Sequence, residues 1–394
     1  MSDLDLSYIL NQLGEQHEEY FNAVSPPIVQ TSNFLFDTVD GMRQAFAAEY
    51  DVFLYSRGNN PTVEILKQKL AALDGAEDAL VFNSGASAIF CSVLPFVKSG
   101  DHIVSVKAPY TWAQRLFDVI LPRFGVTTTY IDGTAIEHWQ AATKSNTVLY
   151  YLESPNSWTY ELQDLSAVAA LAKQHNIVTV IDNSYCTPLY QQPIKHGIDL
   201  VLQSATKFIG GHSDVVAGVV SGSKAHMSKI FYSEYMTTGA GATPFHAWLL
   251  LRGLRTLPIR LERVTRTTHT MMAWLKQQPW VSNIIYPLDP QHPQYALAKS
   301  QMKDAGGLLT FALEVKTVQQ MESFCNALKR FRMAVSWGGH ESLIIPKCAG
   351  MPAADFDASN ATHRQVRVYF GLEDAEVLQQ DLLQAGKQAG LNIH

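Results

Sequence analysis

Residues 200–214 (Leu-Val-Leu-Gln-Ser-Ala-Thr-Lys-Phe-Ile-Gly-Gly-His-Ser-Asp) decide the fold of this chain. They open with a short apolar run, and a second apolar run at 178–181 ends in Asp182. Apolar runs of this length predict buried strands of an α/β protein. Open α/β sheets bind ligands at the carboxyl ends of their strands. The strand at 178–181 delivers an acid to that edge, and the strand that opens residues 200–214 delivers two hydroxyls and a lysine.

The residues at these two strand ends are Asp182, Ser204, Thr206 and Lys207. Catalysis with pyridoxal 5'-phosphate (PLP) needs these residue types. A lysine holds the cofactor as a Schiff base, an acid keeps its pyridine nitrogen protonated, and hydroxyls bind its phosphate. Taken alone, an ordinary strand-end acid and a solvated surface lysine are the commoner explanation. The four residues therefore indicate PLP chemistry without deciding it.

Two longer segments carry a resemblance to a known family. Residues 182–188 (Asp-Asn-Ser-Tyr-Cys-Thr-Pro) and 204–214 resemble the signature of the Cys/Met-metabolism PLP-dependent enzymes, which include cystathionine β-lyase, cystathionine γ-synthase and methionine γ-lyase. The resemblance extends over nearly the whole chain. It implies PLP as the cofactor and the α/β, PLP-dependent transferase-like fold (fold type I). That fold has a mainly parallel central sheet with helices on both faces, plus a smaller C-terminal α+β domain.

Size and composition are those of a large globular protein. The chain has 394 residues and 47% hydrophobic content, enough for a large core and for two or three domains. Its net charge of −6 is spread without blocks, so nothing indicates a nucleic-acid or membrane partner. Residues 1–5 are acidic, unlike a signal peptide, and no apolar run approaches a membrane span. The four cysteines are scattered like free thiols, so we expect a cytoplasmic protein.

The order of expected elements divides the chain into three parts. Residues 1–57 show few clear strands and are expected to form an N-terminal arm that contributes to the neighbouring subunit's site. Residues 58–252 are the expected PLP-binding domain, because apolar runs alternate there with helical patterns. Residues 253–394 are expected to form the C-terminal domain. The strands expected in the middle part are residues 79–82, 103–106, 147–151, 178–181, 200–202 and 215–220.

Helix signals frame this middle part. Asn60-Pro61 predicts a helix that begins with an asparagine cap and runs to about residue 73, before Gly75. In the C-terminal part, a long helical pattern at 255–277 precedes strands near 308–313 and 366–370.

Further cofactor-binding residues are implied by the family motifs. The segment 83–87 follows a strand and opens a helix, an arrangement whose free amides suit an anion. In the family, the amides matching Gly85 and Ala86 bind the phosphate. The family's tyrosine and arginine matching Tyr55 and Arg57 reach the phosphate of the neighbouring subunit's cofactor, and an arginine fork suits this task. The resemblance thus implies a dimer with shared active sites, which we expect to pair into a homotetramer.

Three more motifs imply catalytic and substrate-binding roles. In the family, the tyrosine matching Tyr110 stacks on the pyridine ring and assists the leaving group, although here Thr111-Trp112 replaces the usual continuation of that motif. Lys207 is the expected proton-transfer base. The segment 367–374 (Arg-Val-Tyr-Phe-Gly-Leu-Glu-Asp) resembles the family's carboxylate-binding strand, so Arg367 is the expected partner of the substrate carboxylate. The remaining expected substrate contacts are Ser157, Ser336 and Trp337.

Pocket residues divide the family into enzymes that cleave at the β- or the γ-carbon. Residues 153–157 (Glu-Ser-Pro-Asn-Ser) and Ser336-Trp337 resemble the β-lyases, and Val335 stands where many γ-enzymes that act on cystathionine carry glutamate. We therefore expect elimination of the cystathionine β-lyase type, giving pyruvate, ammonia and a thiol.

Other segments favour different activities, which stay open. Residues 55–62 and 182–188 look closer to the γ-enzymes. They are compatible with a γ-lyase acting on methionine, cystathionine or another amino acid with a sulfur or oxygen leaving group. A γ-replacement synthase that joins a thiol to an activated homoserine would use the same cofactor residues. Trp112, Trp158 and His340 lie close to family motifs and are candidates for substrate selection.

Two further classes fit less well. A non-catalytic PLP-binding protein would not need the carboxylate partner Arg367. A metal enzyme is disfavoured because histidines such as His196 and His212 show no ligand spacing of the H-E-x-x-H kind, so no metal residues are expected.

Overall fold

The computed structural model of the protein describes residues 4–393, so the first three residues of the acidic N-terminus lie outside the described part. Contacts within the chain divide it into two compact units. Unit 1 comprises residues 1–154, 162–210 and 214–255, and unit 2 comprises residues 155–161, 211–213 and 256–394. Unit 2 therefore includes two short segments from the middle of the sequence. The three-part division, with residues 1–57 as an arm serving another subunit, stays a prediction.

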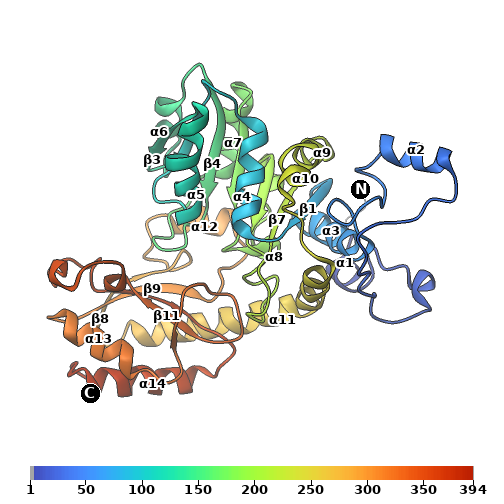
Figure 1. Cartoon of the computed structure of the whole chain (residues 1–394). Helices are drawn as coiled ribbons and strands as arrows, with labels where there is room; N and C mark the ends of the chain where they lie inside the picture. The colour runs from blue at the N-terminus through green and yellow to red at the C-terminus, as the bar shows by residue number, and fades with distance from the viewer. Residues whose placement is uncertain (1–3, 394) are drawn as a thin grey trace. The chain divides into compact units, whose positions relative to one another are not determined.

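Unit 1 is built around a seven-stranded sheet (Figure 1). Every neighbouring pair of strands is parallel except the two pairs formed by β7, with β1 and with β6. The mainly parallel sheet expected from the sequence is thereby confirmed. The carboxyl ends of β4, β5 and β6 meet at one edge of the sheet. The strands in spatial order are β1 (Asp78–Phe82), β7 (Gly218–Gly222), β6 (Leu200–Gln203), β5 (Val178–Asp182), β4 (Thr147–Glu153), β2 (His102–Val106) and β3 (Thr127–Ile131).

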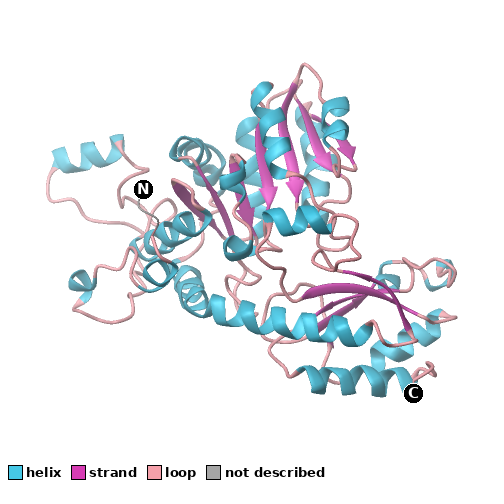
Figure 2. Ribbon diagram, turned by 180° about the vertical axis from the view of Figure 1, so that it is seen from behind, coloured by secondary structure: helices cyan, strands magenta, loops and turns pink. Residues whose placement is uncertain are grey.

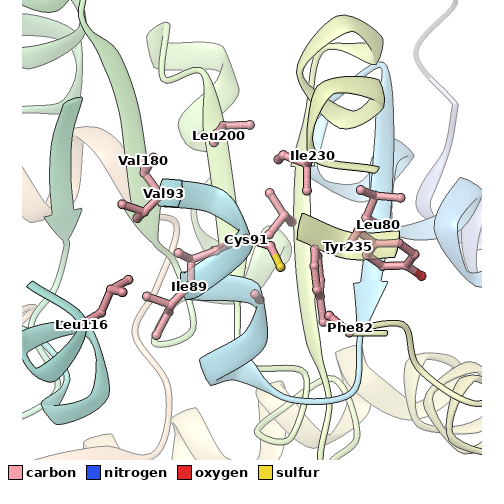
Figure 3. Close-up of a cluster of buried hydrophobic side chains, with 14 of the residues drawn as sticks. Leu80, Phe82, Ile89, Cys91, Val93, Leu116, Val180, Leu200, Ile230 and Tyr235 are labelled. Atoms are coloured by element: carbon pink, nitrogen blue, oxygen red, sulfur yellow. The ribbon is translucent and has the colours of Figure 1, made fainter. Parts of the chain in front are cut away.

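Helices cover both faces of this sheet. Alternate residues of β2, β4, β5 and β6 enter two different apolar clusters, one on each face. Val180 lies in the cluster around α4, which also contains Ile89 and Cys91 (Figure 3), while its neighbour Ile181 lies in the second cluster with Trp139. The helices of unit 1 are α1 (Leu6–Asn11), α2 (Val39–Ala47), α3 (Pro61–Asp74), α4 (Gly85–Val93), α5 (Thr111–Arg115), α6 (Ile136–Ala142), α7 (Leu165–Gln174), α8 (Thr187–Tyr190), α9 (Lys224–Ile230) and α10 (Met236–Thr238).

The N-terminal boundary of α3 follows the local sequence signal closely. The side chain of Asn60 accepts a hydrogen bond from the amide of Thr62, and Pro61 occupies the first helical position. Gly75 ends the helix in the left-handed conformation, with φ of 71°. The predicted helix is confirmed at both ends.

Two strands of the sheet differ from expectation. The last strand of unit 1, β7, begins at Gly218 rather than residue 215. The backbone of Ala217 is hydrogen-bonded to the side chain of Thr206 rather than to a neighbouring strand. The edge strand β3 escapes prediction because its sequence, Thr-Thr-Thr-Tyr-Ile, is mostly polar and its residues are half-buried or exposed. It is recognised only through its pairing with β2.

The segment before α3 is anchored at one point and otherwise exposes apolar side chains. Buried Glu15 lies 3.0 Å from Nζ of Lys69 and 2.9 Å from Nη2 of Arg255, so an ion cluster ties this segment to α3 and α11. Further along, Phe21 is 99% exposed and Leu35 is 96% exposed. Exposed apolar side chains of this size are typical of an interaction surface.

Unit 2 contains a five-stranded sheet of mixed direction, with helices α13 and α14 side by side along it (Figure 2). The long helix α11 (Pro244–Leu275) contains Pro258, and the division between the units falls after Arg255 within it. No helix among residues 4–393 is long and apolar enough to cross a bilayer. The elements of unit 2 are β10 (Arg332–Met333), β11 (Leu343–Pro346), β12 (Gln365–Tyr369), β9 (Leu308–Leu313), β8 (Val281–Ile285), α12 (Tyr295–Gln301), α13 (Val318–Ala327) and α14 (Ala375–Gln388).

Candidate active site

Asp182 is the last residue of β5 and is buried. Burial raises the pKa of its carboxyl, while the hydroxyl and amide of Ser184 and the positive charge of Lys207 lower it. The amide of Ser184 donates to Oδ1 of Asp182 at 2.9 Å. The expected acid and the expected lysine of unit 1 are thus electrostatically coupled, and a bound cation beside Asp182 would favour its ionised form.

Ser184 connects Asp182 to the next strand end. Its Oγ accepts a hydrogen bond of 2.6 Å from the amide of Ser204, the residue that follows β6. The amide of Lys207 in turn donates to the carbonyl of Ser204 at 3.0 Å, which closes the turn that carries the lysine. Ser184 belongs to the motif at 182–188, but the motif did not indicate a role for it. The role becomes visible only in the structure, where β5 and β6 are neighbours and Ser184 joins their ends.

The start of α4 and Ser204 form a close-fitting cradle. The side chain of Ser84 caps the helix by accepting a hydrogen bond from the amide of Ser87. The first amides of a helix have no hydrogen-bond acceptor within the helix itself. A Cβ atom at Gly85 would lie 3.1 Å from Oγ of Ser204, so glycine is what lets the hydroxyl approach the helix start. Gly85, Ala86 and Ser204 are therefore brought together, with the amides and hydroxyl that an anion such as phosphate requires.

Thr206 is placed differently from its neighbour Ser204. Its Oγ1 lies 3.1 Å from both the amide nitrogen and the carbonyl oxygen of Ala217, so its hydroxyl stabilises the turn before β7. The hydroxyl must rotate to donate to a phosphate. A phosphate contact from Thr206 stays a prediction, and its turn-stabilising bond is a role that the sequence did not indicate.

Tyr110 is held near Asp182 by a buried glutamate. Its backbone amide donates to Oε2 of Glu153 at 2.7 Å, and Glu153 at the end of β4 pairs in register with Asp182. Burial and the charges of Asp182 and Glu153 raise the pKa of the Tyr110 phenol. The phenol therefore keeps its proton at neutral pH. The sequence analysis used Glu153 only as part of the 153–157 motif and did not predict that it holds Tyr110. Its position at the end of a strand was the signal for this role.

Arg367 lies in β12 of unit 2 and is only 7% exposed. Its Nη1 donates to the carbonyl of Ser157 at 3.1 Å, and its Cζ lies 4.8 Å from the ring centre of Trp158. Tyr369 lies two residues further along the strand and therefore on the same face, where its hydroxyl donates to the carbonyl of Gly339 at 2.9 Å. Ser157 thus meets Arg367 through its backbone.

The loop before β11 carries the remaining expected substrate contacts. Ser336 adopts the left-handed backbone conformation, with φ of 83°, and Trp337 is buried. Glu341 accepts a hydrogen bond of 2.7 Å from Oγ of Ser213, and its Oε2 lies 3.2 Å from Nδ1 of His340. A serine in this conformation is uncommon and indicates a loop shape imposed by its surroundings.

Tyr55 and Arg57 both lie on the exposed N-terminal segment of unit 1. Cζ of Arg57 lies 5.3 Å from the ring centre of Tyr55. Their solvent-facing position matches what a site in another subunit would need. Among residues 4–393, no group of three or more His, Cys, Asp or Glu side chains could hold a metal ion.

The residues of unit 1 fit PLP, because they combine a buried acid, a coupled lysine and a glycine-lined anion cradle. The fold and these residues define a PLP-dependent enzyme. Comparison with known proteins gives the family. The family model of Cys/Met metabolism PLP-dependent enzymes matches residues 9–387, and the chain belongs to this family. The expected family, fold class, cofactor and PLP-dependent carbon–sulfur (or related) lyase type are confirmed.

Individual relatives indicate which members of the family this chain resembles. The chain is 36% identical to the L-methionine gamma-lyase of Treponema denticola, over 93% of this chain and 92% of the relative. It is 33% identical to the cystathionine gamma-lyase of Bacillus subtilis, over 93% of this chain and 95% of the relative. The crystal structure of metB from Corynebacterium glutamicum superposes with a TM-score of 0.87 at 32% identity, covering 97% of each chain. These relatives favour the γ-lyase alternative over the β-lyase expected from the pocket motifs.

Proposed function

We propose that the protein is a PLP-dependent γ-lyase that acts on a sulfur-containing L-amino acid such as methionine or cystathionine. Its products would be 2-oxobutyrate, ammonia and a thiol. The observation that carries this proposal is the likeness to methionine and cystathionine γ-lyases over more than nine-tenths of the chain. The β-lyase expectation rested on Ser157, Val335 and Trp337. Ser157 contacts Arg367 through its backbone carbonyl, a contact that does not depend on the identity of its side chain.

The residues of unit 1 would perform the proton transfers. Bound PLP supplies an electron-withdrawing ring that stabilises the electron pair left when the α-proton departs. The amine of Lys207 would hold the cofactor, be released when the substrate amine replaces it, and then move protons from the α- and β-carbons. Asp182 would keep the pyridine nitrogen protonated. Tyr110, whose phenol keeps its proton, would donate that proton to the departing sulfur.

Arg367 would bind the substrate's α-carboxylate. A guanidinium forms two parallel hydrogen bonds with a carboxylate, which fixes the orientation of the bonds around the α-carbon. The position of Arg367 in the segment 367–374, which resembles the family's carboxylate-binding strand, supports this role.

Product analysis tests the proposed reaction. We expect purified protein loaded with PLP to release 2-oxobutyrate and cysteine from L-cystathionine, and 2-oxobutyrate and methanethiol from L-methionine, as measured by mass spectrometry. Pyruvate with homocysteine from L-cystathionine would show that β-elimination is correct. A product that forms only when a thiol is added to an activated homoserine would show a replacement synthase.

We also propose that each active site uses Tyr55 and Arg57 of a second subunit, in a dimer or a tetramer built from dimers. The exposure of both side chains and of the apolar residues around them supports this arrangement. An Arg57→Ala variant and a Lys207→Ala variant should each be inactive. A mixed dimer should regain about half of the wild-type activity per dimer, because one of its two sites keeps both residues. An inactive mixed dimer, verified by mass spectrometry, would contradict shared sites.

A further inference from the structure

Two neighbouring residues of one short loop contact the buried guanidinium of Arg367. The carbonyl of Ser157 accepts from Nη1, and the indole of Trp158 lies beside Cζ at 4.8 Å from the ring centre. The carbonyl engages one N–H group, whereas the indole attracts the cation through its π-face and uses none. A guanidinium held by its face can direct its N–H groups in a fixed plane toward a carboxylate.

The loop that carries Trp158 is firmly fixed within unit 2. Oδ1 of Asn156 accepts the amide of Trp158 at 2.9 Å, and the carbonyl of Trp158 accepts from Oγ1 of Thr310 at 3.3 Å. Thr310 pairs in register with Arg367 across β9 and β12. Buried Tyr160 places its hydroxyl 3.1 Å from the same Oγ1. The backbone of Trp158 is therefore attached to the strand position beside the arginine that its ring contacts.

A second cation uses the same ring. Nζ of Lys347 lies 4.5 Å from the ring centre of Trp158, in the turn that follows β11. Two positive charges near one indole repel each other, and the π-electrons partly offset this repulsion. The charge of Lys347 also raises the electrostatic potential at Arg367, which favours an anion there. The ring of Trp158 thus contacts both Arg367 and a second source of positive charge.

We propose that Trp158 is a positioning residue that holds the Arg367 guanidinium in the orientation that binds the substrate's α-carboxylate. This role rests on the proposed function in one respect, the assignment of Arg367 to that carboxylate. It explains why a large aromatic side chain follows Ser157. It also makes carboxylate recognition in this chain depend on a loop distant in sequence from the arginine.

Binding of an unreactive probe tests this role independently of turnover. Norleucine has the shape of methionine but no leaving group, and its primary amide lacks the carboxylate charge. We expect the PLP-loaded wild-type protein to bind norleucine more tightly than the amide in calorimetry. Trp158→Leu should reduce this preference about ten-fold, whereas Trp158→Phe, which keeps an aromatic face, should reduce it by less than about three-fold. With a turned-over substrate, Trp158→Leu should raise KM about ten-fold and change kcat little.

The matched control is Trp274→Leu, which removes a half-buried indole of unit 2 that packs on Trp280. It should leave the acid-to-amide preference unchanged. An unchanged preference in Trp158→Leu would overturn the proposal, and so would an equal loss in Trp158→Phe and Trp158→Leu. If wild type prefers the acid but releases no 2-oxobutyrate, the γ-lyase assignment fails while the role of Trp158 stands. If wild type shows no preference, the assignment of Arg367 fails and the role of Trp158 with it.

Discussion

Replacing Lys207 with alanine is expected to lower turnover by at least about 10⁴-fold, because one amine performs both the attachment of the cofactor and the proton transfers. The variant should also lose the visible absorbance that arises from the covalent bond between the lysine and PLP. The fold should persist, since Lys207 is half-buried at the end of a turn whose backbone hydrogen bonds do not need its side chain. Steady-state kinetics and an absorbance spectrum measure both effects.

The control for this variant is Lys195→Ala, which removes an exposed lysine from the turn before β6. It should retain the activity and the spectrum of the wild type. Substantial turnover by Lys207→Ala, with PLP present and contaminating enzyme excluded, would remove Lys207 from the centre of the mechanism. Partial recovery of activity on adding a small primary amine would support its role in proton transfer.

Replacing Asp182 with asparagine should lower kcat on the order of 10²–10³-fold, because the amide cannot hold the compensating charge beside a protonated pyridine nitrogen. Burial raises the pKa of Asp182, so its ionised form costs stability in the apo-protein as the pH rises above the usual carboxyl range. Asparagine avoids this cost. The Tm of the apo variant at neutral pH should therefore be no lower than that of the apo wild type. Addition of PLP should raise the Tm of the variant by less than it raises the Tm of the wild type.

Asp164→Asn is a suitable control, because it keeps a good capping residue at the start of α7 and should change neither kinetics nor the response to PLP. An Asp182→Asn protein with wild-type kcat would exclude this carboxylate from the site. An apo variant that melts well below the apo wild type would indicate that the charge of Asp182 stabilises the fold, contrary to its raised pKa.

Much of the fold could be predicted from local sequence. The cap at Asn60 and the buried strand ending at Asp182 are encoded by residues next to one another in the chain. The start of α11 could also have been recognised, because Oγ1 of Thr243 accepts the amide of His246 at 3.2 Å in an ordinary N-cap. The edge strand β3 could not, because its polar residues carry no periodicity and only pairing with β2 defines it.

The residues of the candidate site likewise fall into those that local motifs predict and those that only the folded structure brings together. Lys207, Asp182 and Arg367 could be proposed from motifs, because each keeps its chemical type at a characteristic position. The supporting contacts of Glu153 and Trp158 depend on which strand ends and loops meet, and no local pattern encodes that meeting. The motifs leave the choice between β- and γ-cleavage open, because residues 153–157 and Ser336-Trp337 resemble the β-lyases while residues 55–62 and 182–188 look closer to the γ-enzymes. The relatives that match over more than nine-tenths of the chain favour γ-cleavage.

The assignment of residues 155–161 to unit 2 limits how this protein can be recombined with its relatives. A chimera joined at residue 256 would inherit Arg367 from one parent and the loop that holds it from the other. Exchange of the C-terminal region alone would therefore mix two different arrangements for carboxylate binding. A functional hybrid would have to carry residues 155–161, which lie between β4 and α7, together with the distant strand they support.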